Sequence, residues 1–286
     1  MWKIGNLIAA IMTGCLALQA AQANEPNQIQ AEAEMSQNKV LLTRAMNALF
    51  NEHDIDQVRE LYAADYIQHN PNVPTGLEPI LGLVPALAEA NFRYEIHRMI
   101  EDGDLILTHS TAYNAEFFGA NQVVAFDLWR IEDGKVAEHW DSIIPVYETT
   151  VSGRTQTDGA IEITDLDKTT ANKNLVEAFV TEVLIAEDFS KMGNYVRNGL
   201  YDQHNPLVAD GPDALQNVIM EAGLKNHKIH RVIGEGNFVL TQSEGDWNGK
   251  PMAIYDLFRV EDGFIVEHWD VLQEIPSTMA HDNGMF

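Results

Sequence analysis

The sequence predicts an α+β protein made of two copies of one domain, with helices first in each copy and an antiparallel sheet after them. The first observation is a repeat: residues 126–141 and 255–270 are nearly the same, and both end in Glu-His-Trp-Asp. The second is that apolar residues in each copy recur first at helical spacing and then at every second position. Runs of helix followed by runs of strand are typical of α+β domains.

Two shorter blocks extend the repeat toward the N-terminus. Residues 66–71 (Tyr-Ile-Gln-His-Asn-Pro) match residues 201–206, and residues 96–100 match residues 229–233. The blocks keep their order, while the offset between the copies falls from 135 residues at the first block to 133 and then to 129. A long period with drifting offsets indicates two whole domains that differ by short loop changes, not a solenoid of small repeats.

Each copy is expected to begin with helices. In the first copy, apolar residues recur at helical spacing from Lys39, and a second helix is expected from about Asp56 to just before Tyr66. The Gln-His-Asn-Pro turn follows, because proline restricts the residue before it and does not continue a helix. A third helix is expected from Gly76 to Ala90. The matching helices of the second copy cover residues 175–184 and 189–196.

Strands are expected after the third helix, because the apolar pattern changes there to period two. In the first copy they cover residues 94–100, 105–113, 123–131 and 136–144. Asp-Gly pairs at residues 102–103 and 133–134 mark turns. Three helices on one face of a curved sheet would form a cone with an interior pocket.

The hairpin at residues 132–134 determines which side chains share a face of the sheet. A two-residue loop would place Asp127 opposite Trp140, whereas a three-residue loop with Gly134 in a left-handed bulge would place it opposite His139. Both turns favour Asp-Gly, and we adopt the three-residue loop. One face then holds Ala125, Asp127, Trp129, His139 and Asp141, and the other holds Phe126, Leu128, Val136 and Trp140. The first set corresponds in the second copy to Ile254, Asp256, Phe258, His268 and Asp270.

Two carboxylates and an imidazole on one apolar wall suit proton transfer. Burial raises the pKa of a carboxyl group, and a second carboxylate nearby raises it further. Such a group can exchange protons near neutral pH, as general acid–base catalysis requires. The residues fit equally a structural pair, in which Asp141 and His139 satisfy each other's hydrogen bonds.

His69 and His204 lie in the Gln-His-Asn-Pro turns, near the expected mouth of each cavity. They could contact a substrate or hold the backbone of the turn, and we favour the structural role. His97 and His230 each begin a strand, where a hydrogen-bonded histidine is commoner than a catalytic one. The candidate substrate-binding residues are His69, His204, Trp129, Phe258, Gln68 and Gln203.

No cofactor and no metal ion is expected. The sequence has no phosphate-binding glycine-rich loop, no serine nucleophile elbow and no dinucleotide fingerprint, and its histidines lack zinc-site spacing. A net charge of −25 argues against nucleic acid and against anionic membranes as partners. The expected partner is a small hydrophobic ligand or substrate.

Residues 1–23 have the pattern of a secretory signal peptide. Lys3 precedes an apolar run at residues 4–18, and Ala21-Gln22-Ala23 forms a cleavage site. The run is shorter than the ~20 residues that span a membrane. Cys15, the only cysteine, lies within it. We expect a periplasmic or secreted protein without disulfides, with lipidation at Cys15 as the less favoured alternative.

The remaining segments follow from the repeat. We expect a flexible leader at 24–37, a first domain at 38–148, a linker at 149–171, a second domain at 172–276 and a tail at 277–286. The apolar outer faces of the two sheets are expected to pack on each other as an internal pseudo-dimer, and higher oligomers stay open.

The repeated blocks resemble the SnoaL-like (polyketide-cyclase-like) family of the NTF2-like superfamily, over about residues 38–148 and 172–274. The resemblance implies cone-shaped α+β barrels, each with a cavity for a small hydrophobic molecule. In the polyketide cyclases of this family, an aspartate on the last strand is the acid/base of an intramolecular aldol closure. It corresponds to Asp141 and Asp270. Asp127 and Asp256 stand where those cyclases have a cavity-facing histidine.

We therefore expect an exported protein that performs cofactor-free acid/base catalysis (cyclisation, isomerisation or lyase-type) on a small hydrophobic carbonyl compound. Asp141 and Asp270 would be the acid/base groups in two competent pockets. The expected assisting residues are Asp127, Asp256, His139 and His268. The alternative is a periplasmic protein that binds a small molecule without transforming it.

Overall fold

The computed structural model describes residues 35–197 and 201–286. The expected signal peptide and Cys15 lie outside the described residues, as does most of the expected leader. The chain divides into two compact units, Met1–Val40 and Leu41–Phe286, and the second unit holds nearly all of both copies. Among the described residues, no helix is both long enough and apolar enough to cross a membrane.

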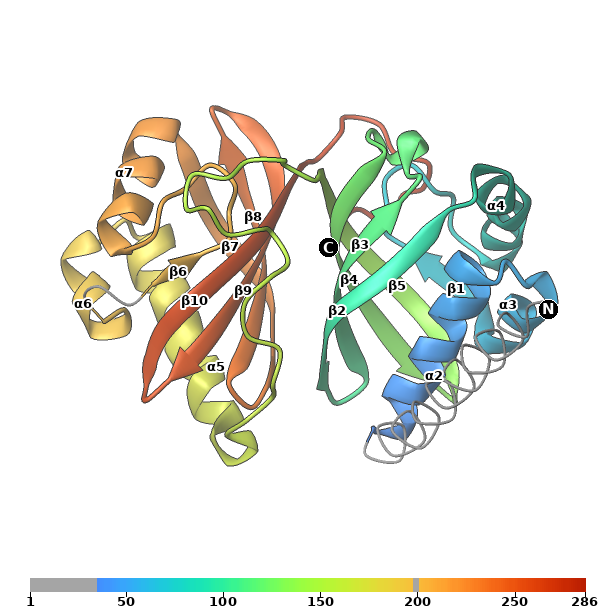
Figure 1. Ribbon diagram of the computed structural model, residues 1–286, viewed down its shortest axis with the longest axis horizontal. Helices are drawn as coiled ribbons and strands as arrows, with labels where there is room; N and C mark the ends of the chain where they lie inside the picture. The colour runs from blue at the N-terminus through green and yellow to red at the C-terminus, as the bar shows by residue number, and fades with distance from the viewer. Residues whose placement is uncertain (1–34, 198–200) are drawn as a thin grey trace, which may run out of the picture. The chain divides into compact units, whose positions relative to one another are not determined.

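The first copy consists of three helices, a strand between the second and third of them, and four further strands (Figure 1). Its helical elements are α2 (Gln37–Met46), the π-helical turn η1 (Asn47–Asn51), α3 (Ile55–Leu61), α4 (Leu77–Ala90) and the 3-10 turn η2 (Glu116–Phe118). Its strands are β1 (Tyr62–Gln68), β2 (Arg93–Asp102), β3 (Leu105–Tyr113), β4 (Gln122–Glu132) and β5 (Lys135–Pro145). They form one sheet in the order β1-β5-β4-β3-β2.

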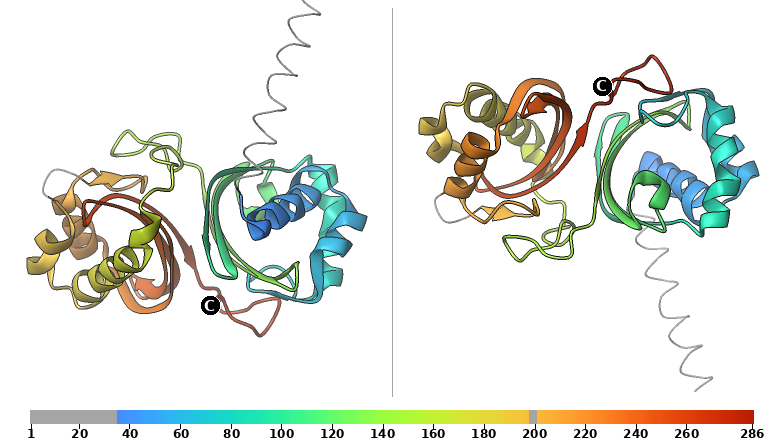
Figure 2. Two further views of the ribbon diagram at one scale, coloured as in Figure 1. Left: turned by 90° about the horizontal axis from the view of Figure 1, so that it is seen from below. Right: turned by 90° about the horizontal axis from the view of Figure 1, so that it is seen from above.

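The second copy repeats this order of elements. Its helical elements are η3 (Leu166–Lys168), α5 (Thr169–Phe179), η4 (Val180–Ile185), η5 (Phe189–Lys191), α6 (Met192–Tyr195) and α7 (Pro212–Ala222). Its strands are β6 (Asp202–Gln203), β7 (Leu224–Glu235), β8 (Phe238–Trp247), β9 (Lys250–Glu261) and β10 (Phe264–Glu274), in the sheet order β6-β10-β9-β8-β7. Two α+β domains in tandem are thus confirmed, and each sheet curves strongly when it is seen end-on (Figure 2).

One strand of each sheet was not expected. Residues 62–65 were expected to be helical, but Tyr62–Gln68 is strand β1, which pairs with β5 in parallel. The sheet is therefore mixed and not purely antiparallel. Tyr62 and Tyr66 are both buried, and tyrosine is favoured in strands, so packing decides against extending α3. In the second copy, β6 pairs with β10 in the same way.

The hairpin between β4 and β5 differs from both expected registers. Its loop has two residues, Asp133 and Gly134, with φ of 50° and 71°, as a type I′ turn requires. A bulge at Ala137 then shifts the pairing by one residue, because Ile131 pairs with Val136 whereas Arg130 pairs with Glu138. Val136 consequently joins the core under the helices, so its expected place on the outer face is wrong.

The bulge sets the pairing further along the strands. Asp127 lies opposite Asp141, not opposite His139 or Trp140. The expected grouping of Ala125, Asp127, Trp129, His139 and Asp141 on one face nevertheless holds, because these residues still alternate along β4 and β5. The second copy has the same two-residue loop and the same shift, with Asp256 opposite Asp270.

The outer faces of the two sheets share one buried apolar cluster. Its members include the six residues Phe126, Leu128, Trp140, Tyr255, Leu257 and Trp269. The Ser142 hydroxyl also donates to the Val271 carbonyl, 3.2 Å away. The expected internal pairing of the copies through these faces is therefore present in the structure.

The expected linker and tail are packed segments. The tail residue Ala280 donates its backbone N–H to the Pro71 carbonyl of the first copy, and Met285 is buried. On the linker, the carbonyls of Thr157, Asp158 and Ala160 accept hydrogen bonds from Arg98. α5 begins at Thr169, inside the range expected for the linker.

Candidate active site

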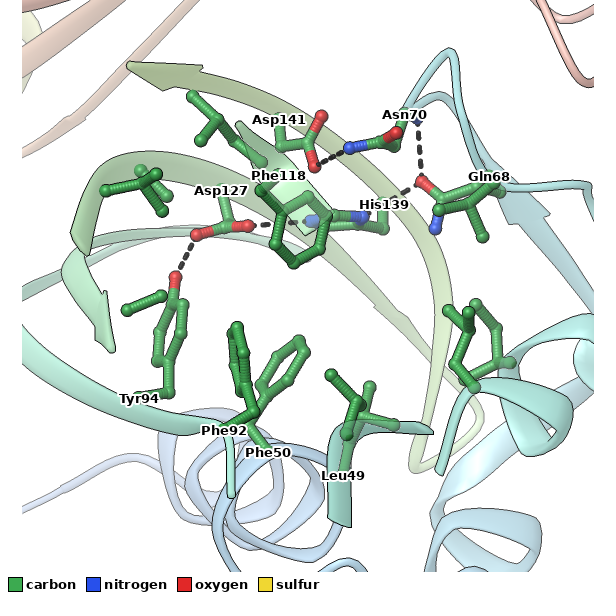
Figure 3. A pocket seen from close by; sticks show the side chains of 18 of the residues that line it. Leu49, Phe50, Gln68, Asn70, Phe92, Tyr94, Phe118, Asp127, His139 and Asp141 are labelled. Carbon is green, nitrogen blue, oxygen red and sulfur yellow. Dashed lines mark hydrogen bonds and ion pairs between the residues drawn. The ribbon is translucent and has the colours of Figure 1, made fainter. Parts of the chain in front are cut away.

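The first copy holds a cavity between the concave face of its sheet and its helices (Figure 3). We call it the first cavity. Its polar wall comes from three neighbouring strands, β4, β5 and the end of β1, and its other walls are apolar and largely aromatic. The polar residues are Gln68, Asn70, Asp127, His139 and Asp141. The aromatic residues are Phe50, Tyr66, Phe92, Tyr94, Phe117, Phe118 and Trp129. The sheet thus presents carboxylates to a space that is otherwise apolar.

His139 is held on both sides of its ring. Gln68 Oε1 accepts the backbone N–H groups of His69 and Asn70, at 2.9 and 2.8 Å, which fixes the orientation of the Gln68 amide. His139 Nδ1 lies 3.0 Å from the same oxygen, so it must carry a proton and donate. Trp129 stacks on the imidazole ring, with 3.9 Å between ring centroids.

The other nitrogen of His139 shares a proton with Asp127. Nε2 lies 3.0 Å from Asp127 Oδ1, and both groups are buried. Because Nδ1 is already protonated, this contact requires one further proton, held either by the imidazole or by the carboxyl group. The pair therefore stores one proton in the wall of the cavity.

Tyr94 completes this chain of hydrogen bonds. Its hydroxyl donates to Asp127 Oδ2. Burial, followed by the charge of Asp127, raises the pKa of Tyr94 well above its usual value, so the hydroxyl keeps its proton. The sequence analysis missed Tyr94 because it lies outside the repeated blocks. Its place at the start of a strand, two residues after Phe92, was the only signal.

Asp141 differs from Asp127 in having an oxygen without a partner. Asn70 Nδ2 donates to Asp141 Oδ2 at 2.6 Å, whereas Oδ1 is buried and has no hydrogen-bond partner among the described residues. Burial, reinforced by Asp127 and opposed by His139 and Asn70, raises the pKa of Asp141 to about 6. Asp141 can therefore gain or lose a proton near neutral pH.

The second copy keeps most of this arrangement. His268 Nδ1 lies 2.9 Å from Gln203 Oε1, and Nε2 lies 3.1 Å from Asp256 Oδ1. Burial also raises the pKa of Asp270 to about 6. Asn205, however, donates to both oxygens of Asp270, at 2.9 and 2.8 Å. Asp256 Oδ2 has no hydrogen-bond partner in the described part of the chain.

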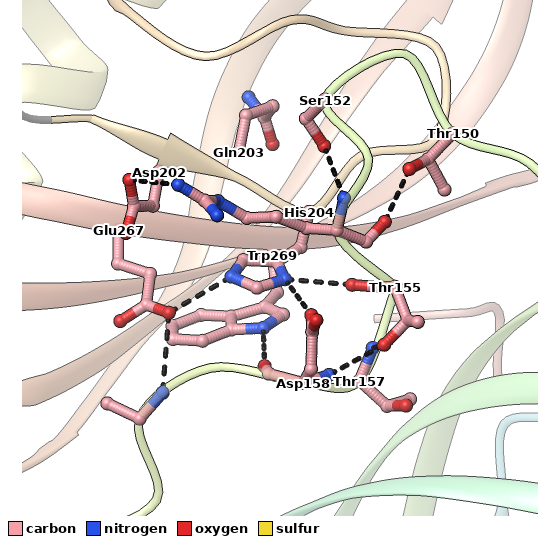
Figure 4. A network of polar contacts seen from close by, with 12 residues as sticks. Thr150, Ser152, Thr155, Thr157, Asp158, Asp202, Gln203, His204, Glu267 and Trp269 are labelled. Atoms are coloured by element: carbon pink, nitrogen blue, oxygen red, sulfur yellow. Dashed lines mark hydrogen bonds and ion pairs between the residues drawn. The ribbon is translucent and has the colours of Figure 1, made fainter.

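His69 and His204 lie outside the cavity linings. His69 bonds Glu138 and the Gly284 carbonyl, both at 2.9 Å. His204 bonds Glu267 at 3.0 Å and the Thr155 carbonyl at 2.8 Å (Figure 4). Both histidines thus join the turn to the tail or the linker through contacts beyond the turn itself, and their role in substrate binding stays a prediction.

The other candidate substrate-binding residues divide between the copies. Gln68 and Trp129 line the first cavity, whereas Gln203 and Phe258 line neither the first cavity nor the cavity beside Asp270. His97 bonds the Thr111 hydroxyl at 2.8 Å, and His230 lies 3.1 Å from the Glu244 carboxylate. His97 is thus a hydrogen-bonded strand histidine, as expected, whereas His230 Nε2 is buried near Glu244 without a hydrogen-bond partner in the described residues.

Each copy could in principle offer a metal ion three ligands. The atoms come from Asp127, His139 and Asp141, or from their counterparts Asp256, His268 and Asp270, and within each set they lie within 4.8 Å of one another. A metal on His139 would have to displace the proton shared with Asp127. The arrangement suits proton storage better, and the expected absence of a metal stays a prediction.

Comparison with known proteins gives one family match. The model of the SnoaL-like domain matches residues 43–139. No curated protein matches the chain.

Several solved structures are similar to part of the chain. TsrD from Streptomyces laurentii is 21% identical, with 38% of this chain and 91% of that chain covered and a TM-score of 0.33. IdmH, described as a putative polyketide cyclase from Streptomyces antibioticus, is 22% identical over 38% and 92%, with a TM-score of 0.33. A putative ketosteroid isomerase from Kribbella flavida is 11% identical over 38% and 83%, with a TM-score of 0.33.

The family match runs from the last turn of α2 to the middle of β5 and includes Gln68, Asn70, Asp127 and His139 of the cavity wall. Asp141 follows two residues after its end. The chain therefore contains a SnoaL-like domain at residues 43–139.

Proposed function

We propose that the first copy catalyses cofactor-free proton transfer on a small hydrophobic carbonyl compound, with Asp141 as the acid/base. The observation that carries the proposal is the buried, unpartnered Oδ1 of Asp141 in a largely apolar cavity. A carboxylate oxygen without a partner is costly to bury, and active sites are where such groups are retained. The SnoaL-like domain and the raised pKa of Asp141 support the same assignment.

In the proposed step, ionised Asp141 removes a proton from the carbon next to the carbonyl group, through Oδ1. The C–H electron pair forms a C=C bond with the carbonyl carbon, and the carbonyl π electrons move to the oxygen. The enolate oxygen that results needs a hydrogen-bond donor. The proton shared by Asp127 and His139 is the donor stored in the same wall. Asp141 then returns its proton to another carbon, which gives isomerisation, or to a new alkoxide, which gives cyclisation.

The surroundings of Asp141 suit this task. Asn70 holds one carboxylate oxygen and so orients the other. The apolar walls exclude water, which keeps the carboxylate basic enough to act near pH 6–8. The cavity is narrow, about 50 Å³, so a substrate larger than a few atoms requires the aromatic side chains, among them the exposed Phe117, to move.

The proposal can be tested by exchange of α-protons for deuterium in 2-tetralone, an apolar ketone, followed by NMR in D₂O. The wild-type chain should accelerate exchange over buffer, and Asp141→Asn should reduce the acceleration at least a hundredfold. Asp133→Asn, in the exposed turn between β4 and β5, is the matched control and should exchange like the wild type. Thermal unfolding shows that each variant is folded.

Two results would decide against this function. Full activity in Asp141→Asn would remove the carboxylate from the mechanism. Saturable binding of 2-tetralone without exchange would instead favour the alternative, a protein that holds a small molecule without transforming it.

We also propose that the chain is exported, on the evidence of the apolar run and the Ala21-Gln22-Ala23 site. Expressed in a Gram-negative bacterium, it should be recovered from the periplasm, and its mass should be that of a chain whose first residue is Asn24. Ala23→Arg should block cleavage and leave the longer form. A cytoplasmic, uncleaved wild-type chain would contradict export, and a lipid-modified Cys15 would support the lipoprotein alternative.

A further inference from the structure

The two copies differ at the position of Tyr94. Tyr94 pairs with Ala112 on β3, and the second-copy residue that pairs with the equivalent Gly245 is Asn226. The extra residue His227 forms a bulge just after it. Asn226 is buried but too short to replace the tyrosine. Its Nδ2 and the Oδ2 of Asp256 are both buried without a hydrogen-bond partner in the described residues.

The second difference concerns the carboxylate itself. In the first copy, Asn70 engages a single oxygen of Asp141 and leaves the other free. In the second copy, Asn205 engages both oxygens of Asp270. Both elements that prepare the first copy for proton transfer, the tyrosine and the free oxygen, are thus absent from the second.

The third difference is the cavity beside Asp270, which we call the second cavity. Its volume is about 230 Å³, and its walls are almost entirely apolar. They include Leu207, Val218, Trp247 and Leu272 of the second copy and Pro145 and Tyr147 of the first. Asp256 and His268 do not line it, although their counterparts Asp127 and His139 line the first cavity.

We propose that the second cavity is a binding site, not a second active site, and that it takes a small apolar molecule carrying one hydrogen-bond donor. Asp270 and Asn205 are its charged and amide groups, and Asp270 supplies the acceptor. An ionised carboxylate has about four lone-pair positions, so Asp270 can accept a further bond beside those from Asn205. A ligand hydroxyl or amine would meet that oxygen while its carbon skeleton fills the rest.

The volume sets the size of this molecule. Ligand cavities commonly reach ~300–1,000 Å³, so 230 Å³ fits one or two fused rings and excludes larger polycyclic compounds. The ligand would also touch Pro145 and Tyr147, which follow Asp141 on β5 and just beyond it. Residues of both copies therefore form the site, and the second copy alone would not complete it.

The chain carries one tryptophan as a reporter in each cavity, Trp129 in the first and Trp247 in the second. We suggest labelling the whole chain with 5-fluorotryptophan and titrating it with 2-naphthol at pH 7.5, followed by ¹⁹F NMR. Trp247→Phe assigns the resonance of Trp247. That resonance should shift saturably, and 2-methylnaphthalene, which lacks the donor, should bind at least fivefold more weakly.

A matched pair of variants locates the site. Val218 on α7 and Leu83 on α4 are equivalent positions, half-buried, and each lines the cavity of its own copy. Val218→Phe should raise the Kd of 2-naphthol, measured from the shift of the Trp247 resonance, at least tenfold. Leu83→Phe should change this Kd less than twofold. A Trp247 resonance that does not move, or that moves equally in Val218→Phe and the wild type, would overturn the proposal.

The division of roles rests on the proposed function, because it takes Asp141 as the catalytic group. It has its own test: Asp141→Asn, with Asp270 intact, should retain under one hundredth of the exchange of 2-tetralone. Retention of about half would show that the second copy is also active. The ¹⁹F titration requires no turnover, so it tests binding in the second cavity independently of the proposed reaction.

Discussion

The guanidinium of Arg98, in the first copy, stacks on the indole ring of Trp269, in the second, with 4.2 Å between Cζ and the ring centroid. Arg231 of the second copy lies over Trp140 of the first at the same distance. Each tryptophan also stacks on a histidine of its own copy, His204 at 4.6 Å and His69 at 4.8 Å. The interface is thus built twice from the same residue types.

The two arginines should differ in their effect on stability. Arg98 is buried and donates to three linker carbonyls, whereas Arg231 has a side-chain bond to Gln242 and no such set of carbonyls. Arg98→Ala should lower the free energy of unfolding by about 2–4 kcal/mol, because it removes charge-assisted hydrogen bonds and a cation–π contact together. Arg231→Ala should cost about 1–2 kcal/mol.

Urea unfolding of the two alanine variants measures this difference. Arg98→Lys is a second check, because lysine keeps the charge but not the planar set of donors, and it should recover less than half of the loss. Equal losses for the two alanine variants would show that the linker carbonyls add nothing to the interface.

Tyr94→Phe should lower activity without lowering stability. Tyr94 stacks on Phe50, with 4.9 Å between centroids, and phenylalanine keeps that contact while it removes the donor to Asp127. We expect α-proton exchange to fall about tenfold, since one donor of the charged network is lost. The control is Tyr113→Phe, whose partly exposed hydroxyl bonds Glu95 outside the cavity. Equal exchange rates for the two variants would remove Tyr94 from the site.

The repeated sequence predicted what the two copies share. It located four of the five strands of the first copy and placed Asp127, His139 and Asp141 on one face, because alternation along a strand survives a change of register. The facing pairs were wrong, because the bulge at Ala137 depends on packing under the helices and leaves no signal in the Asp-Gly turn.

A repeat is a poor guide to residues in which the copies differ. Tyr94 has no tyrosine counterpart, so the comparison of copies could not single it out. The contacts of the linker and of the tail were also missed, because they run through backbone carbonyls, such as those of Thr155 and Gly284, which any sequence provides. Side-chain pattern carries no information on such bonds.

Removal of metal ions should leave the proposed activity intact. Both nitrogens of His139 are engaged, and a metal would take the place of the proton shared with Asp127. Dialysis against EDTA should change α-proton exchange less than twofold. Added Zn²⁺ should inhibit, because ligation by Asp141 would occupy the oxygen that removes the proton. Loss of exchange in EDTA with recovery in Zn²⁺ would instead identify the three-residue cluster as a metal site.

Asp141→Asn should stabilise the fold at high pH and not at low pH. Burial raises the pKa of Asp141 from 3.8 to about 6, so the unfolded chain ionises first as the pH rises, and folding loses stability through that interval. Above pH 6 the loss is complete and amounts to about 3 kcal/mol. Asparagine does not ionise, and its side-chain oxygen can still accept the bond from Asn70.

The free energy of unfolding in urea at pH 4, 6 and 8 measures this effect. The free energy of unfolding of Asp141→Asn should exceed that of the wild type most at pH 8, less at pH 6 and hardly at all at pH 4. Asp133→Asn, an exposed turn residue, should show no such trend. A difference in the free energy of unfolding that is constant with pH, or larger at pH 4 than at pH 8, would show that folding does not oppose the ionisation of Asp141.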